Sequence, residues 1–405
     1  MDPQPSTAGT GEAPQGRAAR ATPGPRPPLV IVGASCRAAA ASATAAGWAV
    51  HAADLFDDRD LAATAVATRR AGHYPDDLVS AVASFPPAPW CYTGALENHH
   101  HILDSIAARR PLAGNDAACV RYVRQPATLA TILSLAGLRA PESVAAPDGV
   151  PTDGSFLRKP QASAGGRGIV VWTPLLPPAR EPCIWQRRTA GEPLSAVLAL
   201  SADSGRVLGI TRQLVGAAWC RAPAFAFCGA ILMPHATVPT QVYTQFDSLA
   251  TTLAARCGLR GIVGSDAILE PDGLLTVLEV NPRPTASAEL VERSTGASIM
   301  ALHLAAFGHA SPHPSHAGCP GVWSKAILFA ARPTPIDARL LDRLAARAAP
   351  WTGADGHPAL ADIPRPGQVL RSGTPILTVF ARGDTEPESV AELHHRIAAV
   401  IAVTC

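Results

Sequence analysis

Acidic and amide side chains that could hold a metal ion close a predicted β-hairpin in the second half of the chain. The segment reads GSDAILE, then Pro271-Asp272-Gly273, then LLTVLEVNPRP, and Asp-Gly favours a two-residue hairpin turn. With that turn, Pro271 faces Leu274 and counting back places Asp266 directly opposite Glu279. A four-residue loop would place the two carboxylates on a diagonal of the same face. The period-two alternation of a strand keeps Asn281 on that face as well.

Carboxylates in an otherwise apolar hairpin require a partner. Mg²⁺ (or Mn²⁺) shared with the phosphates of a substrate is suited to one or two carboxylates and an amide oxygen. We therefore predict Asp266, Glu279 and Asn281 as metal ligands. Arg283 would lie where negative charge develops during a reaction. The alternative is a structural hairpin whose carboxylates pair with arginine or lysine side chains elsewhere.

A lysine followed by a glycine-rich loop precedes this hairpin. FLRKP-QASAGGRGI places Lys159 at the end of a strand and the small residues Ser163–Gly168 directly after it. Small residues allow backbone N–H groups to approach phosphate oxygens, and a lysine adds a point charge. The order differs from that of a P-loop, in which the lysine follows the glycines. An ordinary glycine-rich hairpin turn is the alternative. Further on, CIWQRRTAGEPLSAVLAL could supply a strand edge for an adenine and, through Glu192, a contact to a ribose.

The elements that must position these groups predict a mixed α/β (α+β) protein. PPLVIVGASCRAAAASATAAGWAVHAADLF reads as strand, helix and strand, and short strands separated by Gly and Pro turns follow from Phe156 onward. A helix is predicted over Thr240–Cys257. We predict five segments, namely a disordered lead-in (1–28), an N-terminal α/β domain (29–115), a central domain (116–308), a linker (309–323) and a C-terminal α/β module (324–405).

The composition favours small-molecule partners. The 405 residues carry 34 basic and 32 acidic side chains, and this balance argues against a nucleic-acid or membrane-surface protein. No apolar run reaches the roughly 18–20 residues that span a bilayer. Nine scattered cysteines without a CxxC pair favour a reducing, cytoplasmic compartment.

Taken in order, these pieces resemble the ATP-grasp superfamily over about residues 29–300. The shared order is an N-terminal α/β domain, a basic residue in the next helix, a strand lysine with a glycine loop, an adenine-edge strand, and a final D…E-x-N-x-R pattern. The resemblance implies an ATP-grasp fold, ATP and Mg²⁺ as cofactors, an acyl phosphate intermediate, and small-molecule carboxylate and amine substrates, with homodimers frequent. It implies nucleotide contacts from Lys159, Ser163, Gly165, Gly166, Gly168, Ile184, Gln186, Arg187 and Glu192, and catalytic roles for Lys159 and Arg283.

Two departures from the family pattern stand out. The first metal ligand is often Glu and is here Asp266. The first family lysine is replaced by arginine, either Arg121 or Arg124, and the sequence does not decide between them. GASxRAAA, TGALEN at Thr93–Asn98, RKPxxSAGGRG and the DIPxPG tail are similar to bacterial ATP-grasp proteins associated with tetrahydromethanopterin- and methylofuran-linked one-carbon metabolism.

Two other functions compete with an ATP-dependent carboxylate–amine ligase. A non-catalytic ATP-binding regulator would share the nucleotide site but make no ADP. A nicotinamide-dependent oxidoreductase is suggested by Gly33 and by Asp54 about 20 residues on, but Ser35 and Ala38 replace the second and third fingerprint glycines. In ATP-grasp proteins this domain helps to form the acceptor-substrate site, for which Ser35 and Arg37 are candidates.

Overall fold

The computed structural model describes residues 26–352 and 356–404. The predicted disordered lead-in, residues 1–28, lies outside the described residues except for positions 26–28, and Pro28 already begins the first strand. Among the described residues, no helix is both long enough and apolar enough to cross a lipid bilayer.

The N-terminal segment forms a parallel four-stranded sheet with the order β3-β2-β1-β4. The predicted strand–helix–strand unit is present as β1 (Pro28–Gly33), α1 (Arg37–Ala45) and β2 (Ala49–Asp54). The other elements are α2 (Arg59–Thr64), β3 (Ala67–Arg70), α3 (Leu78–Ala83), β4 (Trp90–Tyr92), a 3-10 helix (Leu96–Asn98) and α4 (His100–Ala107). Neither α2 nor β3 was predicted, because both are short and α2 buries only Leu61.

One antiparallel sheet runs through the rest of the chain, with the order β13-β12-β9-β10-β11-β14-β18-β16. Its strands are β9 (Glu192–Leu200), β10 (Gly205–Val215), β11 (Phe227–Leu232), β12 (Gly261–Leu269), β13 (Leu275–Asn281), β14 (Val322–Phe329), β16 (Leu360–Ala361) and β18 (Pro375–Gly383). The strands of the predicted C-terminal module therefore continue the sheet that carries the β12–β13 hairpin and the predicted metal ligands. The predicted linker is hydrogen-bonded to α8, since the Cys319 N–H donates to the Arg293 carbonyl (2.9 Å).

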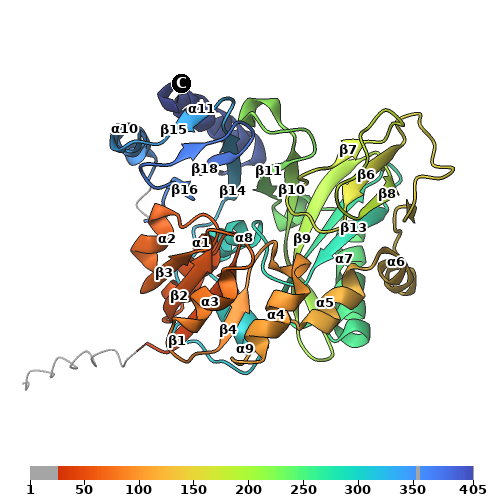
Figure 1. Cartoon of the computed structure of the whole chain (residues 1–405), viewed down its shortest axis with the longest axis horizontal. Coiled ribbons are helices and arrows are strands. Elements are labelled where there is room, and N and C mark those ends of the chain that lie inside the picture. Colours follow the sequence, from red (N-terminus) through yellow and green to blue (C-terminus); the bar gives the residue numbers. More distant parts are fainter. Residues whose placement is uncertain (1–25, 353–355, 405) are drawn as a thin grey trace, which may run out of the picture.

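A smaller antiparallel sheet, β5-β8-β6-β7, carries the lysine and the glycine loop. It consists of β5 (Ser143–Val144), β6 (Phe156–Pro160), β7 (Val170–Val171) and β8 (Cys183–Arg187), and a two-stranded ribbon joins β15 (Thr334–Pro335) to β17 (Val369–Leu370). Figure 1 shows this small sheet to one side of the large sheet, with the N-terminal sheet beneath the C-terminal strands.

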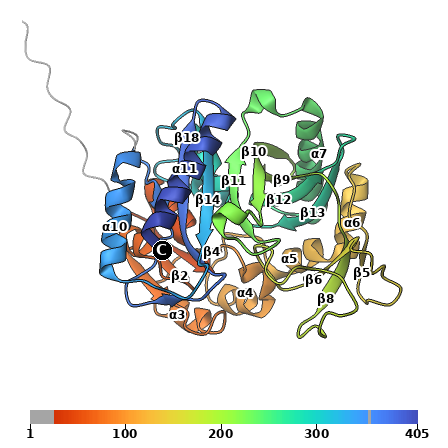
Figure 2. The ribbon, with the colours of Figure 1, turned by 90° about the horizontal axis from the view of Figure 1, so that it is seen from above.

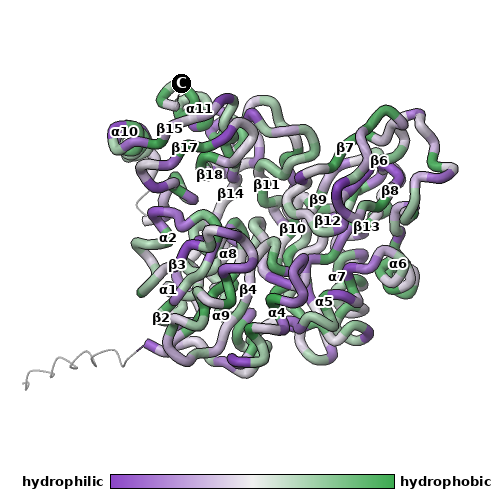
Figure 3. The backbone as a smooth tube through the Cα atoms, viewed as in Figure 1, coloured by the Kyte–Doolittle hydropathy of each residue, from purple (hydrophilic) through white to green (hydrophobic). Residues whose placement is uncertain are grey.

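Helices cover the sheets. They are α5 (Ala117–Arg124), α6 (Pro126–Leu135), α7 (Thr240–Cys257), α8 (Ala288–Thr295), α9 (Ile299–Ala305), α10 (Ala338–Ala348) and α11 (Glu386–Thr404), with 3-10 turns at Ala218–Cys220, His235–Thr237 and Ala349–Trp351. In Figure 2, α7 lies against β9 and β10, and α11 lies against β14 and β18. The amphipathic character of these surface helices is visible on α10, which carries both hydrophilic and hydrophobic stretches in Figure 3.

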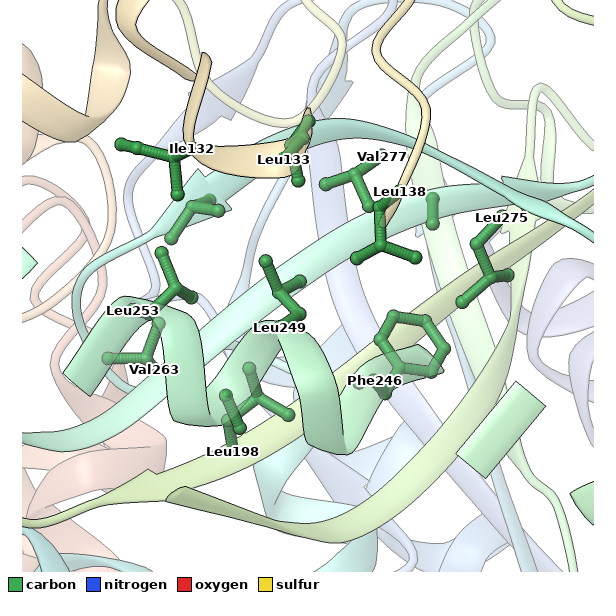
Figure 4. Close-up of a cluster of buried hydrophobic side chains, with 14 of the residues drawn as sticks. Ile132, Leu133, Leu138, Leu198, Phe246, Leu249, Leu253, Val263, Leu275 and Val277 are labelled. Carbon is green, nitrogen blue, oxygen red and sulfur yellow. The ribbon is translucent and has the colours of Figure 1, made fainter. Parts of the chain in front are cut away.

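The prediction for α7 is confirmed at both ends. Its buried residues Phe246, Leu249 and Leu253 recur at the spacing of one helical face, and Gly258 ends the helix in the left-handed conformation (φ 66°). Figure 4 shows these side chains packed on Leu198 of β9 and Val277 of β13. The opposite face of the same hairpin is thus anchored in the largest apolar core of the described residues, which holds the polar face in place.

Candidate active site

The two predicted metal-ligand carboxylates face each other across the β12–β13 hairpin. Asp266 pairs with Glu279 in the strand register, as predicted, but the hairpin loop is longer than the predicted two-residue turn. The loop holds three residues between Glu270 and Leu274, because the Glu270 N–H donates to the Leu274 carbonyl (2.9 Å). A β-bulge at Leu278, between the Ala267–Val277 and Asp266–Glu279 pairs, compensates for this longer loop.

Asn281 joins the two carboxylates. Its Nδ2 donates to Asp266 Oδ2 (3.1 Å) and to Glu279 Oε1 (3.3 Å). The other oxygen of Asp266 accepts from Gln213 Nε2 of β10 (2.7 Å). Amide N–H groups therefore donate to both oxygens of Asp266 and to one oxygen of Glu279. Gln213 was not predicted, since nothing in GITRQLV marks one polar residue among the others.

Burial and mutual repulsion set the protonation of this pair. Burial, reinforced by the nearby Glu279 carboxylate, raises the pKa of Asp266 to about 7. Burial alone would also raise the pKa of Glu279, but Arg124 and Lys159 hold it down at about 2. The pair therefore tends to share one proton, as expected for two buried carboxylates in contact.

Lys159 approaches the pair from the small sheet. Its ammonium donates to Gln186 Oε1 (2.9 Å), and Gln186 in turn donates to the Ser143 hydroxyl (3.2 Å). Burial lowers the pKa of Lys159, while Glu279 and Asp266 oppose that shift. Lys159 forms no ion pair with any carboxylate of residues 26–352 or 356–404, so its charge is available for an anionic ligand.

Two arginines approach Asn281 from different elements. Arg124, at the end of α5, donates to Asn281 Oδ1 (3.4 Å) and to Asn98 Oδ1 (3.1 Å). Arg283 also donates to Asn281 Oδ1 (3.4 Å). Arg121, the other candidate for the first family lysine, instead pairs with Asp104 at the surface (3.6 Å). The geometry favours Arg124 for the role that the sequence left open.

Arg283 is held by a carboxylate that the sequence analysis did not assign. Its Nη2 donates to Glu97 Oε1 (2.5 Å), and Glu97 is 1% exposed. Burial would raise the pKa of Glu97, but Arg283 lowers it, so the carboxylate is ionised. The Glu97–Arg283 ion pair links the N-terminal sheet to the end of the hairpin.

The glycine loop, Ser163–Gly168, is packed against the segment that leads into β11. The Phe227 N–H donates to the Gly165 carbonyl (3.0 Å), and a Cβ on Gly166 would lie 1.8 Å from the Phe225 carbonyl oxygen. Gly165, Gly166 and Gly168 all have positive φ (62°, 77° and 78°). Only glycine adopts this sequence of conformations at low cost, and at Gly166 the close approach also requires it.

The predicted adenine edge is only partly assembled at the site. Ile184 lies opposite Lys159 in the β6–β8 register, and Gln186 contacts Lys159 directly. Arg187 pairs with Glu142 (2.8 Å) and stacks on Phe156. Glu192 does not line the site, because its carboxylate is bound to Arg212. Its ribose role, implied by the family resemblance, has no support from this geometry.

A cavity of about 1280 Å³ connects these groups. Of the predicted residues it is lined by Arg121, Arg124, Lys159, Ser163, Gly165, Gly166, Ile184, Gln186, Arg187, Asp266, Glu279, Asn281 and Arg283, whereas Gly168 and Glu192 are absent from its walls. The predicted metal ligands, lysine, arginines and glycine loop are therefore brought to one cavity.

The cavity extends beyond this site to a buried ion cluster. Arg37 of α1 donates to Glu289 of α8 (2.9 Å) and to Asp362 (2.9 Å), and Lys325 of β14 lies 3.4 Å from Glu289. Three charged residues of this cluster were not assigned from the sequence. A lysine within the apolar strand VWSKAILF was the one local signal, since an unpaired lysine is rarely buried. Ser35 and Arg37, predicted for the acceptor-substrate site, both line this second region.

The structure gives Gly33 a packing role. A Cβ at this position would lie 2.0 Å from the Thr93 hydroxyl of the neighbouring segment, so the close approach of two strand ends requires glycine. The dinucleotide-like spacing from Gly33 to Asp54 is thus explained without a pyrophosphate.

The donor set fits a magnesium ion bound together with phosphates. The described residues contain no cluster of three or more His, Cys, Asp or Glu side chains that could hold a metal alone. Two carboxylates and an amide, beside an unpaired lysine and two arginines, leave coordination positions for phosphate oxygens, which is how Mg²⁺ is commonly held. A soft or redox metal would call for Cys or His ligands instead.

Comparison with known proteins agrees with this geometry. Residues 127–287 match the ATP-grasp domain family. No curated protein matches the chain by sequence. Similar structures include an ADP complex of PurK, an N5-carboxyaminoimidazole ribonucleotide synthetase (14% identity, 92% of this chain, 97% of that chain, TM-score 0.66), and the ATP complex of the corresponding synthase from Aspergillus clavatus (12%, 93%, 99%, 0.68). The biotin carboxylase domain of the 2-oxoglutarate carboxylase from Hydrogenobacter thermophilus, crystallised with MgADP and bicarbonate, is also similar (13%, 88%, 86%, 0.59).

At these identities the structural likeness establishes the fold, and the matched family establishes the domain. The chain contains an ATP-grasp domain at residues 127–287, which bears out the predicted resemblance to the ATP-grasp superfamily. This domain and fold are those of ATP-dependent enzymes of the carboxylate–amine ligase type, for which ATP and Mg²⁺ are the typical cofactors.

Proposed function

We propose that this enzyme phosphorylates a small carboxylate with ATP and couples the resulting acyl phosphate to an amine. The observation that carries the proposal is the meeting of Asp266, Glu279 and Asn281 with Lys159 and Arg283 in a single cavity. This arrangement offers a hard-cation site, a phosphate-binding charge and a half-buried arginine, which are the groups that such a reaction needs.

Each group has a distinct task in this proposal. Lys159 binds the phosphates of the nucleotide, and the glycine loop covers them with backbone N–H groups. Asp266, Glu279 and Asn281 would hold Mg²⁺, whose charge neutralises the phosphates when it is bound. Arg283 stabilises the negative charge that develops on the transferred group. Positioning and charge neutralisation, rather than acid–base chemistry, then account for most of the rate.

The acceptor substrate would occupy the second region of the cavity. Ser35 and Arg37 lie there, and its walls are formed by the N-terminal helix α1, by α8 and by the C-terminal strands. The motifs shared with ATP-grasp proteins of tetrahydromethanopterin- and methylofuran-linked metabolism support a place in one-carbon cofactor biosynthesis. A homodimer and a cytoplasmic location remain part of this proposal.

ADP release against a panel of carboxylates and amines tests the proposal. Each pair is assayed with Mg²⁺, without Mg²⁺, and with hydroxylamine replacing the amine to trap an acyl phosphate as hydroxamate. Release that requires both Mg²⁺ and a carboxylate, with hydroxamate formed, supports the ligase. Tight MgATP binding with no ADP from any pair would favour a non-catalytic ATP-binding protein.

Two variants locate the activity. Lys159→Ala and Glu279→Gln should reduce ADP release by at least about 100-fold while the fold is retained. Arg139→Ala provides a control, because Arg139 pairs with Asp272 (2.8 Å) at the exposed hairpin turn, outside the cavity. Near-normal turnover in both site variants would contradict the assignment.

A further inference from the structure

The segment Gly94–Asn98 follows β4 and lies at the end of the cavity where the phosphates are proposed to bind. It lies outside residues 127–287, which match the ATP-grasp domain family. It begins in a tight turn, with Ala95 in the left-handed region (φ 71°), and continues as the 3-10 helix. Left-handed backbone at a non-glycine residue is costly and is retained where the surroundings impose it. Gly94, Glu97 and Asn98 all line the cavity.

The first part of this segment fixes Arg283. Glu97 Oε1 accepts from Arg283 Nη2 (2.5 Å), and a Cβ at Gly94 would lie 3.4 Å from the guanidinium carbon. The guanidinium is therefore bound by a buried carboxylate and lies close to a backbone turn. A charge-assisted hydrogen bond to a buried carboxylate restricts the orientation of the arginine strongly.

The next residue fixes the second arginine and reaches the glycine loop. Asn98 Oδ1 accepts from Arg124 Nη2 (3.1 Å), while Asn98 Nδ2 donates to the Ser163 carbonyl (3.2 Å). Ser163 is the first residue of the glycine loop. One amide side chain thus contacts the arginine that reaches Asn281 and the loop that would cover the phosphates.

We propose that Glu97 and Asn98 are positioning residues that orient Arg283 and Arg124, and that Asn98 couples closure of the glycine loop to the placement of Arg124. This inference rests on the proposed function, because it assigns the two arginines to a bound nucleotide. Binding of the nucleotide closes the loop onto Asn98, and the same side chain then holds Arg124 against Asn281. The N-terminal segment is in this way part of the nucleotide site.

Two variants separate the two roles. Glu97→Gln removes the charge that holds Arg283 but leaves Asn98 intact, whereas Asn98→Ala removes the contacts to Arg124 and to Ser163. Asp57→Asn is the matched control, since Asp57 forms an ion pair with Arg365 (2.9 Å) between distant segments and does not line the cavity. Circular dichroism and thermal unfolding show whether each variant folds. Asn98 is half-buried, so Asn98→Ala carries the test if Glu97→Gln does not fold.

The first measurement is the division of the effect between kcat and KM. With the carboxylate–amine pair that the wild type uses, both site variants should lose about 100-fold in kcat, because a displaced arginine no longer meets the developing charge. In Glu97→Gln, KM for MgATP should change by less than about threefold, since Lys159 and the glycine loop are untouched, whereas in Asn98→Ala it should also rise because the loop no longer closes over the phosphates. Asp57→Asn should retain wild-type values. Wild-type kcat in both site variants, or an equal loss in the control, would overturn the proposal.

The second measurement needs no acceptor substrate and therefore stands if the proposed ligase reaction is wrong. Arg167 is an exposed residue of the glycine loop, so trypsin cleavage after it reports whether the loop is closed. Mg·AMP-PNP should protect this bond at least about tenfold in the wild type, in Asp57→Asn and in Glu97→Gln, but less than about twofold in Asn98→Ala. Equal protection in Asn98→Ala at saturating nucleotide would overturn the coupling.

Discussion

Replacement of Gly166 by alanine should prevent the glycine loop from closing, and Gly165 provides a matched comparison. Both residues have left-handed backbone conformations, with φ of 77° and 62°, so alanine costs about 1 kcal/mol in conformational energy at either position. A Cβ at Gly166 would lie 1.8 Å from the Phe225 carbonyl oxygen, whereas a Cβ at Gly165 meets no atom within 4 Å.

The magnitude follows from this difference. Ordinary contacts of a Cβ begin above 3.0 Å, so the loop or the Phe225 segment must move by more than an ångström to admit the Gly166→Ala methyl. Displacements of this size in a substrate-covering segment reduce turnover by about 100-fold. Gly165→Ala should cost about fivefold or less, the equivalent of about 1 kcal/mol.

Isothermal titration with Mg·AMP-PNP and steady-state ADP release measure the two effects. Gly166→Ala should lose at least about tenfold in nucleotide affinity as well as turnover, because a loop that cannot close contributes no contacts to the phosphates. This prediction takes the packing of the glycine loop against Phe225 as the closed state of the loop. Equal losses of nucleotide affinity and turnover in Gly165→Ala and Gly166→Ala, or wild-type values in both, would refute that reasoning.

Three further predictions concern stability and metal dependence. Burial lowers the pKa of His303 from 6.5 to about 4, and the unfolded chain therefore takes up its proton first as the pH falls. The free energy of unfolding should therefore be unaffected by His303 above pH 6.5 and should fall by about 3 kcal/mol between pH 6.5 and pH 4. Urea unfolding of His303→Gln should show a weaker pH dependence than that of the wild type. An identical pH dependence in the two proteins would contradict this. Glu289→Gln leaves Arg37 and Lys325 without their shared buried carboxylate and should destabilise the fold by about 3–5 kcal/mol, measured by urea unfolding; a loss below about 1 kcal/mol would show that water or Asp362 compensates. Excess EDTA should abolish the rise in melting temperature caused by ATP, which at 100 times the Kd corresponds to about 2.7 kcal/mol, and an undiminished rise would show that nucleotide binding needs no divalent ion.

The polar face of the hairpin could be predicted because alternation along a strand is a local property. Asp266, Glu279 and Asn281 lie on one face for this reason, although the loop is longer than predicted and the bulge at Leu278 restores the register. The correct pairing thus arose from two local differences that cancel. Neither is encoded by a strong signal, since Pro-Asp-Gly is compatible with loops of two or three residues.

The partners of these residues could not be predicted, because they come from elements distant in sequence. Glu97 lies 186 positions from Arg283, and Gln213 lies 53 positions from Asp266. Glu192 was expected to contact a ribose because of its place in the chain, but in the folded protein it forms an ion pair with Arg212 instead. Single-sequence patterns identify which residue types could do chemistry, but the packing of the sheets decides which of them meet.

The most direct test of the account is the location of a divalent ion in crystals grown with Mn²⁺ and AMP-PNP. Anomalous scattering should place the ion between Asp266 and Glu279, roughly 2 Å from their oxygens and from the nucleotide phosphates, with Lys159 in contact with the same phosphates. Gln213 and Asn281 would then no longer donate to the oxygens that hold the ion. An ion bound elsewhere, with the hydrogen bonds around both carboxylates unchanged, would contradict the central claim.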